Sequence, residues 1–391
     1  MARLGDYIEQ IRGVSYKPTD LHDSLNEESV ALLRANNIQD GHIVIDDVVY
    51  VAKNKVVAKQ YLKKGDILIC TSSGSKELVG KAAYIEENMP MTFGAFCKII
   101  RPKTEYPKYI GHFFQSPYYR RSISDLSAGA NINNIRNEHI EGLEIPIPPL
   151  DEQRRIAAVL DKASDLIAKR REQLDKLDEL VKARFVEMFG DPEFNLRNWP
   201  IVSLSDVCTV GSSKRIYQSE QTFDGVPFLR ISDLNHLIDT GDFCPSLFIS
   251  EEKYQELQQH GQVPIEGDIL VTSRGTLGRC YIIKTTDRFY FQDGMISWIS
   301  NLSNEITSLF IAYLFDMQSM KRQIESMQAG STVSYLSIDM IKRLKIMLPD
   351  RNLQKQFGAF VDQTNKSKLT IQQSLDKLER LKKALMQRYW G

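Results

Sequence analysis

The sequence of 391 residues lacks the marks of secreted, membrane-spanning and metal-binding proteins. Its five cysteines are scattered and share no paired spacing, which argues against a disulfide framework and against a zinc site. The N-terminus has no basic-then-apolar leader, and no apolar run approaches the ~18 residues of a membrane span. We therefore expect a reduced, cytoplasmic, soluble protein without a membrane partner.

Motifs of the common enzyme chemistries are missing as well. The sequence contains no glycine-rich nucleotide loop, no Asn-Pro-Pro-aromatic methyltransferase motif, no metal-protease helix and no evident pair of nuclease carboxylates with a nearby lysine. Its six histidines show no metal-ligand spacing. We therefore expect no catalytic residue, no metal site and no cofactor on this chain.

Net charge is also lacking, because 50 basic residues balance 50 acidic ones. Bulk electrostatics thus gives no sign of nucleic acid, and a nucleic-acid binder with this balance must gather its positive charge locally. The composition is that of a globular protein, with 42% hydrophobic and 26% charged residues. At roughly 150 residues per domain, the length favours two or three domains.

The chain does contain an internal repeat. Residues 128–190 align without a gap with residues 329–391, and the Gly-Asp-Ile-Leu of residues 65–68 recurs at residues 267–270. Between these anchors the two halves diverge. A chain built from two copies tends to fold with internal two-fold symmetry, which suits a bipartite ligand, and duplex DNA is the commonest one. We interpret the repeat as a shared scaffold that carries two different surfaces.

Each copy ends in a long helix with a heptad pattern. Positions taken in alternating steps of four and three, from Ile156 to Met188 and from Phe357 to Tyr389, are mostly apolar, a spacing typical of coiled coils. At several equivalent heptad positions one helix has a charged residue where the other has an apolar one. Each helix is therefore poorly suited to pair with a second copy of itself. We expect the two helices to pair with each other, antiparallel; alternatively, each packs only on its own globular domain. The expected core residues of the helix pair are Ile156, Leu160, Ile167, Leu174, Leu177, Val181, Phe357, Val361, Ile371, Leu375, Leu378 and Leu385.

These patterns divide the chain into four parts. A first globular domain covers residues 1–146 and a first helix residues 147–192, and a second domain and helix follow at 193–348 and 349–391. The expected fold class is α+β. Two mixed α/β domains form a tandem pseudo-two-fold repeat and are separated by a long antiparallel two-helix coiled coil.

The junction between domain and helix carries a family resemblance. Residues 146–156 read Pro-Ile-Pro-Pro-Leu-Asp-Glu-Gln-Arg-Arg-Ile, and they join a mixed globular part to a heptad helix. Together with the Gly-Asp-Ile-Leu strand, the Phe-Gly-Asp helix end and the duplication, this resembles the specificity subunit of type I restriction–modification systems over essentially the whole chain. The second junction departs from the pattern, since it retains only Pro349, and the start of the second helix is therefore expected to be less rigidly fixed.

The resemblance implies a function and partners. Two target-recognition domains would each read one part of a split, asymmetric sequence in double-stranded DNA, with the two helices as an antiparallel spacer. The subunit would have no chemistry of its own. It would dock two methyltransferase subunits, which would bind S-adenosylmethionine, and two motor–nuclease subunits can then join. The alternatives are a coiled-coil-spaced scaffold or binding protein without DNA specificity, and a self-contained enzyme, which the missing motifs disfavour.

Helix length gives this interpretation a physical basis. Residues 152–187 would form a helix ~54 Å long, and major-groove sites on one face of B-DNA recur every ~34 Å. Two readers held apart by such a rod can contact two sites and skip the base pairs between them. Helix length would set the spacing, and the divergent middles would set the sequences.

Candidate DNA contacts lie on loops that follow strands. Residues 71–76 and 272–276 offer hydroxyls, a glycine and a cation to a phosphate, while residues 131–136 and 331–335 include side chains suited to base edges. Ordinary turns and solvated charges are the alternatives. The candidate DNA-binding residues are Thr71, Ser72, Ser73, Lys76, Arg120, Arg121, Asn131, Asn133, Asn134, Arg136, Lys214, Arg215, Tyr217, Arg230, Thr272, Ser273, Arg274, Thr276, Ser331, Thr332 and Tyr335.

Two groups of aromatic residues have other expected roles. A helix is expected over residues 108–122, where Phe113 and Tyr119 recur at helical spacing and are expected in the core rather than as base-stacking platforms. Trp390, next to the last residue, is expected to pack at the base of the first domain and to close the molecule into a ring. The alternative is a tail residue without partners.

Overall fold

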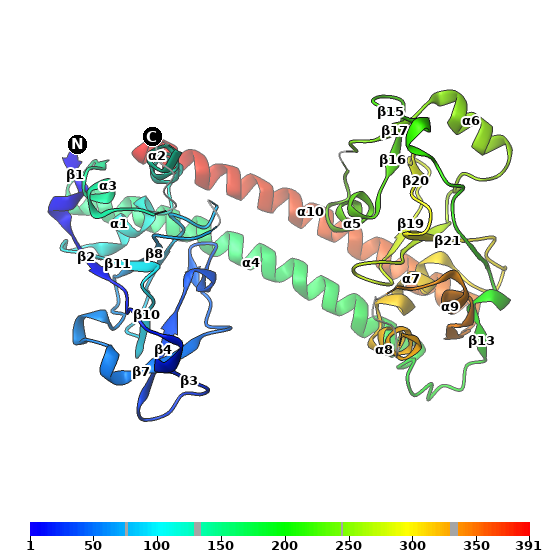
Figure 1. The fold of residues 1–391 in the computed structure, drawn as a ribbon, viewed down its shortest axis with the longest axis horizontal. Helices are drawn as coiled ribbons and strands as arrows, with labels where there is room; N and C mark the ends of the chain where they lie inside the picture. The colour runs from blue at the N-terminus through cyan, green and yellow to red at the C-terminus, as the bar shows by residue number, and fades with distance from the viewer. Residues whose placement is uncertain (75–76, 129–133, 244, 329–334) are drawn as a thin grey trace. The chain divides into compact units, whose positions relative to one another are not determined.

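The structure is a computed structural model that describes residues 1–74, 77–128, 134–243, 245–328 and 335–391. The chain divides into two compact units, drawn in Figure 1. Unit 1 comprises Met1–Gln173 together with Thr370–Gly391, and unit 2 comprises Leu174–Leu369. The C-terminal segment is therefore part of the unit that the N-terminus begins.

Unit 1 is built on two four-stranded sheets. The first has the order β2-β11-β8-β9 with antiparallel neighbours, and the second has the order β10-β4-β7-β3, in which β10 and β4 are parallel. The strands are β1 (Ala2–Arg3), β2 (Ile8–Arg12), β3 (Leu21–His22), β4 (Ser29–Leu33), β5 (Ile38–Gln39), β6 (His42–Ile43), β7 (Val49–Ala52), β8 (Ile67–Cys70), β9 (Ala82–Tyr84), β10 (Met91–Phe93), β11 (Cys97–Pro102) and β12 (Glu144–Ile145). The helices are α1 (Pro107–Phe113), α2 (Pro117–Ala128) and α3 (Asn137–Glu141), with 3-10 turns η1 (Leu4–Tyr7), η2 (Pro18–Asp20), η3 (Ala35–Asn37), η4 (Lys53–Lys55) and η5 (Ala58–Gln60).

Unit 2 repeats both sheets. The order β14-β21-β18-β19 corresponds to the first sheet of unit 1, and β20-β16-β17-β15, with β16 and β20 parallel, corresponds to the second. The strands are β13 (Ile201–Ser203), β14 (Thr209–Gly211), β15 (Gln221–Thr222), β16 (Val226–Leu229), β17 (Phe248–Ile249), β18 (Ile269–Thr272), β19 (Cys280–Ile282), β20 (Tyr290–Phe291), β21 (Ile296–Ser300) and β22 (Lys345–Met347). The helices are α5 (Ile231–Thr240), α6 (Glu251–Gln259), α7 (Ser308–Asp316), α8 (Gln318–Met327) and α9 (Ile338–Arg343), with η6 (Leu204–Asp206) and η7 (Gln218–Glu220).

The divergent middles therefore share a topology and differ in their connections. Unit 2 places helix α5 after β16, where unit 1 has only the short η3 after β4. The turn that begins each connection is the same, because the backbone N–H of Arg34 donates to the Asn37 side chain at 2.8 Å and that of Arg230 donates to Asp233 at 2.9 Å. Sequence divergence has thus changed the surface and kept the sheets.

The central strand of each unit is buried on both faces. Ile67 and Ile69 of β8 belong to a cluster with the helices, whereas Leu68 and Cys70 belong to a second cluster with residues of β4 and β10. Strand β18 alternates in the same way. A continuous apolar run is what a strand with a core on each side requires. Before each strand a glycine with positive φ (Gly65 at 94°, Gly267 at 87°) makes a turn that other residues adopt at a cost.

The aromatic segment before α3 is two helices rather than one. The expected helix over residues 108–122 is interrupted, because α1 ends at Phe113 and α2 begins at Pro117. Proline suits the first turn of a helix, where its missing N–H costs nothing. Phe113 and Tyr119 are buried in the helix-side cluster of unit 1, as expected for core residues.

Two 40-residue helices, α4 (Leu150–Phe189) and α10 (Arg351–Trp390), each follow a repeat of the proline segment. Near their starts two buried glutamines make the same contact, since the side-chain amide of Gln153 donates to Pro148 O at 2.8 Å and that of Gln354 donates to Pro349 O at 2.9 Å. Gln354 also donates to Glu305 O and accepts hydrogen bonds from Thr307. The start of the second helix, which was expected to be less rigidly fixed, thus has side-chain hydrogen bonds where the first junction has additional prolines.

The two helices run antiparallel within each unit. In unit 1, Leu160 near the start of α4 shares a cluster with Met386 near the end of α10. In unit 2, Phe185 near the end of α4 lies 5.4 Å from Phe357 near the start of α10, measured between ring centroids. The antiparallel contact expected from the heptads is thus present in both units, and the same clusters include residues of the adjoining sheets and helices.

Every expected core position of the helix pair is at least half-buried. Ile156, Leu160, Ile167, Val181, Phe357, Val361 and Leu375 are buried, and Leu174, Leu177, Ile371, Leu378 and Leu385 are half-buried. Trp390 is also buried, in the core of unit 1, where its indole N–H donates to Tyr109 Oη at 3.0 Å. The expected packing of Trp390 on the first domain is confirmed.

Candidate nucleic-acid interface

In each unit the structure brings the two candidate segments together. Ser72, after β8, forms an isolated antiparallel bridge with Asn134, and Arg274, after β18, forms the same bridge with Tyr335. The backbone hydrogen bonds next to these bridges also repeat, with Thr71 O accepting at 2.7 Å in unit 1 and Ser273 O at 3.0 Å in unit 2. Segments some 60 residues apart in the sequence thus meet at one edge of each domain.

Three of the candidate hydroxyls support these loops from inside. The side chains of Thr71, Thr272 and Ser273 are buried. Thr71 Oγ1 donates to Phe96 O at 3.1 Å, and Ser273 Oγ lies 2.7 Å from Ser297 Oγ. A hydroxyl held in this way has no free face for a phosphate. The expectation of direct DNA contact is therefore corrected for these three residues, which hold the loops in place.

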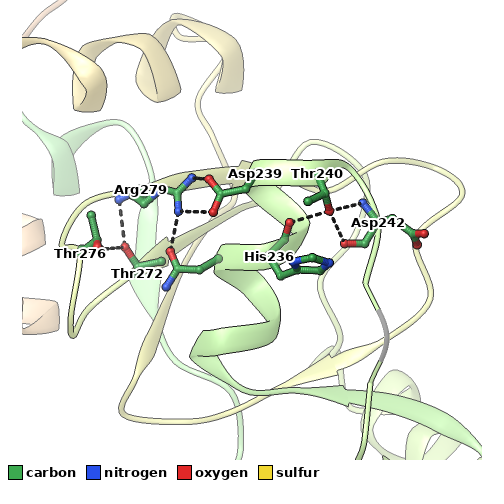
Figure 2. Close-up of polar contacts among 8 residues, drawn as sticks. His236, Asp239, Thr240, Asp242, Thr272, Thr276 and Arg279 are labelled. Carbon is green, nitrogen blue, oxygen red and sulfur yellow. Dashed lines mark hydrogen bonds and ion pairs between the residues drawn. The ribbon is translucent and has the colours of Figure 1, made fainter. Parts of the chain in front are cut away.

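Figure 2 shows how the loop of unit 2 is held. Thr272 Oγ1 donates to Thr276 O and accepts a hydrogen bond from Arg279 N at 3.0 Å. The Arg279 guanidinium donates to Asn235 Oδ1 at 2.9 Å and pairs with Asp239, both on α5. The hydrogen bond from Arg279 lowers the pKa of Asp239. Sequence reasoning missed Arg279, because its acidic partner lies on a helix that only unit 2 contains.

Arg274, Gly275 and Thr276 are the exposed residues of this loop, and two of them carry polar side chains. The Arg274 guanidinium carbon lies 5.0 Å from the centroid of the Tyr335 ring, a cation–π contact that orients a side chain able to bind a phosphate or a guanine edge. In unit 1, Ser72 and Ser73 are half-buried and Asn134 and Arg136 are exposed. Each unit therefore presents a different set of polar groups on the same backbone arrangement.

The other candidate cations are engaged to different degrees. Arg120 donates to the carbonyl oxygens of Glu77 and Val79, at 3.1 and 2.8 Å, and so stabilises the backbone that follows the loop of unit 1. Arg121 is exposed. Ion pairs with acidic residues of unit 2 engage Arg215, Lys214 and Arg230, and Tyr217 is exposed. Five candidates, Lys76, Asn131, Asn133, Ser331 and Thr332, lie outside the described residues.

A groove of about 710 Å³ adjoins the loop of unit 1. Its lining includes Tyr16, Arg34, Asn36, Ser72 and Phe96. Of these, only Ser72 was a candidate from the sequence. The others come from separate loops whose proximity depends on the pairing of the two sheets, so the sequence alone gave no signal for them.

A polar cluster fixes the start of α4 to unit 1. His112 Nε2 lies 2.9 Å from Asp161 Oδ1, and Lys108 Nζ lies 3.2 Å from Asp161 Oδ2. Burial opposes ionisation of Asp161, but the hydrogen bond with His112 and the nearby positive charges outweigh it and lower the pKa of this carboxyl. The contact joins helix α1 of the domain to the long helix.

Other kinds of site find no support in the described residues. Within them, no group of three or more histidine, cysteine or acidic side chains is arranged to hold a metal ion. A search of the same residues finds no helix with an apolar stretch long enough to cross a membrane.

Comparison with known proteins identifies the repeated domain. Residues 10–178 and 197–380 each match the family described as the type I restriction modification DNA specificity domain. The chain belongs to this family. The resemblance to type I specificity subunits is thereby confirmed, and the two matches cover the two divergent middles as well as most of both long helices.

Individual relatives agree. The chain is 43% identical over 173 residues to the type I restriction enzyme StySPI specificity subunit of Salmonella potsdam, and 42% identical over 173 residues to the EcoKI specificity subunit of Escherichia coli strain K12. Each alignment covers 44% of this chain and 37% of the relative. The MjaVIII specificity subunit of Methanocaldococcus jannaschii is 22% identical over 407 residues, covering 99% of this chain and 90% of the relative.

Solved structures of this family share the fold. A chain from a study of complex assembly and conformational transition of the type I R-M system aligns with a TM-score of 0.57 at 17% identity, covering 99% of this chain and 96% of that one. The type I S subunit of M. genitalium aligns with a TM-score of 0.54 at 14% identity, covering 100% and 95%. Both likenesses cover at least 95% of each chain and show that the fold is shared.

Proposed function

We propose that this chain is the noncatalytic DNA-recognition subunit of a type I restriction–modification complex, and that each unit reads one half of a bipartite, asymmetric target. The observation that carries the proposal is the duplicated loop arrangement. Both units pair a loop after the central strand with the segment before a short helix, and both make the same backbone hydrogen bonds there. The side chains on top differ, with Ser72 and Asn134 in one unit and Arg274 and Tyr335 in the other.

In this proposal α4 and α10 are the spacer, an antiparallel two-helix coiled coil. Its support is the burial of the heptad positions and two ion pairs between the helices, Arg171 with Glu379 in unit 1 at 2.9 Å and Lys368 with Asp178 in unit 2. A 40-residue helix is about 60 Å long. Such a rod would fix the number of unread base pairs, while the two readers fix the bases.

The proposal includes partners. Two methyltransferase subunits, which would bind S-adenosylmethionine, would dock on this chain, and two motor–nuclease subunits would join them in the cytoplasm. The long helices have the surface for such docking, because Leu166 and Leu180 of α4 and Leu369 and Leu381 of α10 are large apolar residues that the chain itself leaves exposed.

The test of recognition is a binding selection. The full chain, co-purified with its methyltransferase subunit, is mixed with a pool of duplexes that have a randomised central region, and the bound fraction is sequenced. Two enriched half-sites at one fixed separation are expected. Enrichment of no sequence would contradict the proposal and would favour a scaffold without DNA specificity.

The spacer is tested by lengthening it. Inserting one heptad after Arg170 and one after Ile371 keeps the apolar seam and adds about 10 Å to each helix, which corresponds to about three base pairs of B-DNA. The unread spacer should lengthen while both half-sites stay the same. A heptad inserted into α4 alone is the matched control and should impair folding. Altered half-sites at an unchanged separation would refute the spacer role.

A further inference from the structure

The groove of unit 1 contains an aromatic side chain that the fold leaves in solvent. Phe96, between β10 and β11, lines the groove and is 70% exposed. Folding therefore gains little from this ring. On duplex DNA an apolar side chain such as phenylalanine reads sequence by contact with the thymine methyl group in the major groove, which needs no hydrogen-bond partner.

The backbone under this ring is rigidly held. Phe96 O accepts hydrogen bonds from Thr71 N at 2.9 Å, Ser72 N at 3.2 Å and Thr71 Oγ1 at 3.1 Å. The turn itself closes through Cys97 N, which donates to Gly94 O at 2.8 Å. The fold therefore fixes the backbone position from which the ring projects, so binding a ligand there requires no ordering of the backbone. The buried Thr71 hydroxyl thus helps to hold the backbone of Phe96 at the groove.

Two polar side chains of the same groove are also oriented. Arg34 Nη2 donates to Asp47 Oδ2 at 2.9 Å, and Asn36 Nδ2 donates to the same oxygen at 3.0 Å. Arg34 Nε is buried and has no hydrogen-bond partner among the described residues. Arginine and asparagine are the side chains that read guanine and adenine edges, so the groove combines an apolar face with base-edge donors.

The second unit has the same turn without the ring. Ser273 N donates to Met295 O at 2.9 Å, as Thr71 N donates to Phe96 O in unit 1. Met295 is half-buried and packs against the apolar cluster of its own unit. The backbone is thus shared, and the exposed ring is peculiar to unit 1. Such a difference is what two readers with different targets require.

We infer that Phe96 is a specificity-determining residue whose ring packs against a base in the half-site read by unit 1, with Arg34 and Asn36 at the edge of the same groove. The inference rests on the proposed function, because it takes unit 1 to be a DNA reader. A phenyl ring carries no charge and cannot neutralise a phosphate. Its removal should therefore change sequence preference and leave the salt dependence of binding unchanged.

The experiment compares F96A with the wild-type full chain in the randomised-duplex selection, followed by titration of the selected duplex at several salt concentrations. Loss of recognition at one base pair of a duplex site should weaken binding roughly tenfold. Preference should relax at one position, or at two adjacent positions, of one half-site. F96W, which keeps an aromatic ring, should retain more of the preference than F96A.

Two matched variants serve as controls. Leu25 is 63% exposed in unit 1 and does not line the groove, so L25A should leave affinity and preference unchanged. M295A should leave the half-site of unit 1 unchanged. If F96A proves poorly folded by circular dichroism, F96L, which retains an apolar side chain without an aromatic face, takes its place in the selection.

Three results would overturn the inference while the wild type still selects two half-sites. These are an unchanged preference and affinity in F96A, a uniform weakening with a shallower salt dependence, and a change in the half-site read by unit 2. Failure of the wild type to select any sequence is a separate result, and it would overturn the proposed function itself.

Discussion

Replacing Trp390 should loosen the last turn of α10 from unit 1. The indole is 4% exposed, its ring centroid lies 5.4 Å from that of Tyr109 and 6.2 Å from that of Phe113, and its N–H donates to Tyr109 Oη. Truncating a buried tryptophan to alanine costs about 3–5 kcal/mol. The last turn of α10 can shift and partly fill the cavity that the indole leaves. We therefore expect W390A to cost about 3 kcal/mol, at the lower end of this range.

A smaller change at the same position removes the indole N–H together with only part of the bulk of the ring. W390F keeps an apolar ring and removes one hydrogen bond to a tyrosine whose pKa burial raises to about 12. Tyr109 Oη still donates to Pro146 O at 2.8 Å, so the phenol stays satisfied as a donor. Because the smaller ring also leaves part of the buried volume empty, we expect W390F to cost about 2 kcal/mol, less than W390A.

The assay uses the positions of the three tryptophans. Trp199 and Trp298 belong to unit 2, so fluorescence during urea unfolding of W390A reports unit 2, while circular dichroism reports both units. The circular dichroism transition of W390A should begin at lower urea than that of the wild type, and trypsin should cleave after Arg388 in W390A before the wild type. If W390A unfolds within about 0.5 kcal/mol of the wild type, the docking of the C-terminus is refuted.

Four further substitutions test buried or half-buried polar groups by urea unfolding. Burial raises the pKa of Asp268, so its ionised form is unfavourable at neutral pH, and D268N should stabilise the fold by about 1 kcal/mol. D66N leaves Arg101 without its paired carboxylate and should destabilise the fold by about 2 kcal/mol. Equal changes in the free energy of unfolding of the two variants would contradict this reasoning. Burial and the charge of Arg171 lower the pKa of Lys382, so K382M should stabilise the fold by about 1 kcal/mol near neutral pH. This advantage over the wild type should shrink as pH rises through the lowered pKa toward ~10.4. In that range Lys382 is neutral in the folded protein, and its charge no longer destabilises the wild type. Q354A should cost about 2–3 kcal/mol, since it leaves buried backbone groups without hydrogen-bond partners. A smaller loss of stability in Q354A than in Q153A would contradict the proposed role of Gln354 in anchoring α10.

Much of the fold could be predicted because it depends on local patterns that repeat. The heptads specify a buried stripe and the proline segments specify where the long helices begin, so both helices and their core positions followed from the sequence. The Gly-Asp-Ile-Leu strand could also be predicted, since a strand with a core on each side appears in the sequence as an apolar run. The pairing of the second sheet of each unit could not be predicted, because its short strands pair across long connections, as β4 does with β10.

The sequence pointed to the segments of the candidate site, but it did not show which of their side chains are buried. The repeated loops did meet in each unit, but Thr71 and Thr272 were assigned to DNA and are buried instead. A hydroxyl after a strand gives no sign of which way it faces until the neighbouring turn is known. Phe96 and Arg34 line the groove because the two sheets bring their loops together, which no spacing along the chain reveals.

The two copies of a duplicated fold can differ in sequence where a conserved side chain binds only a backbone group. Asp66 and Asp268 both accept a hydrogen bond from the backbone N–H three residues earlier, at 2.9 Å in each unit, and this bond closes the turn into the central strand. The second partner differs, because Arg101 pairs with Asp66 and the Trp298 indole donates to Asp268. The loops after β8 and β18 show a similar pattern. Their backbone hydrogen bonds are shared, with Thr71 N donating to Phe96 O and Ser273 N donating to Met295 O, whereas their side-chain hydrogen bonds differ. The exposed side chains of one unit can therefore change without a compensating change in the fold.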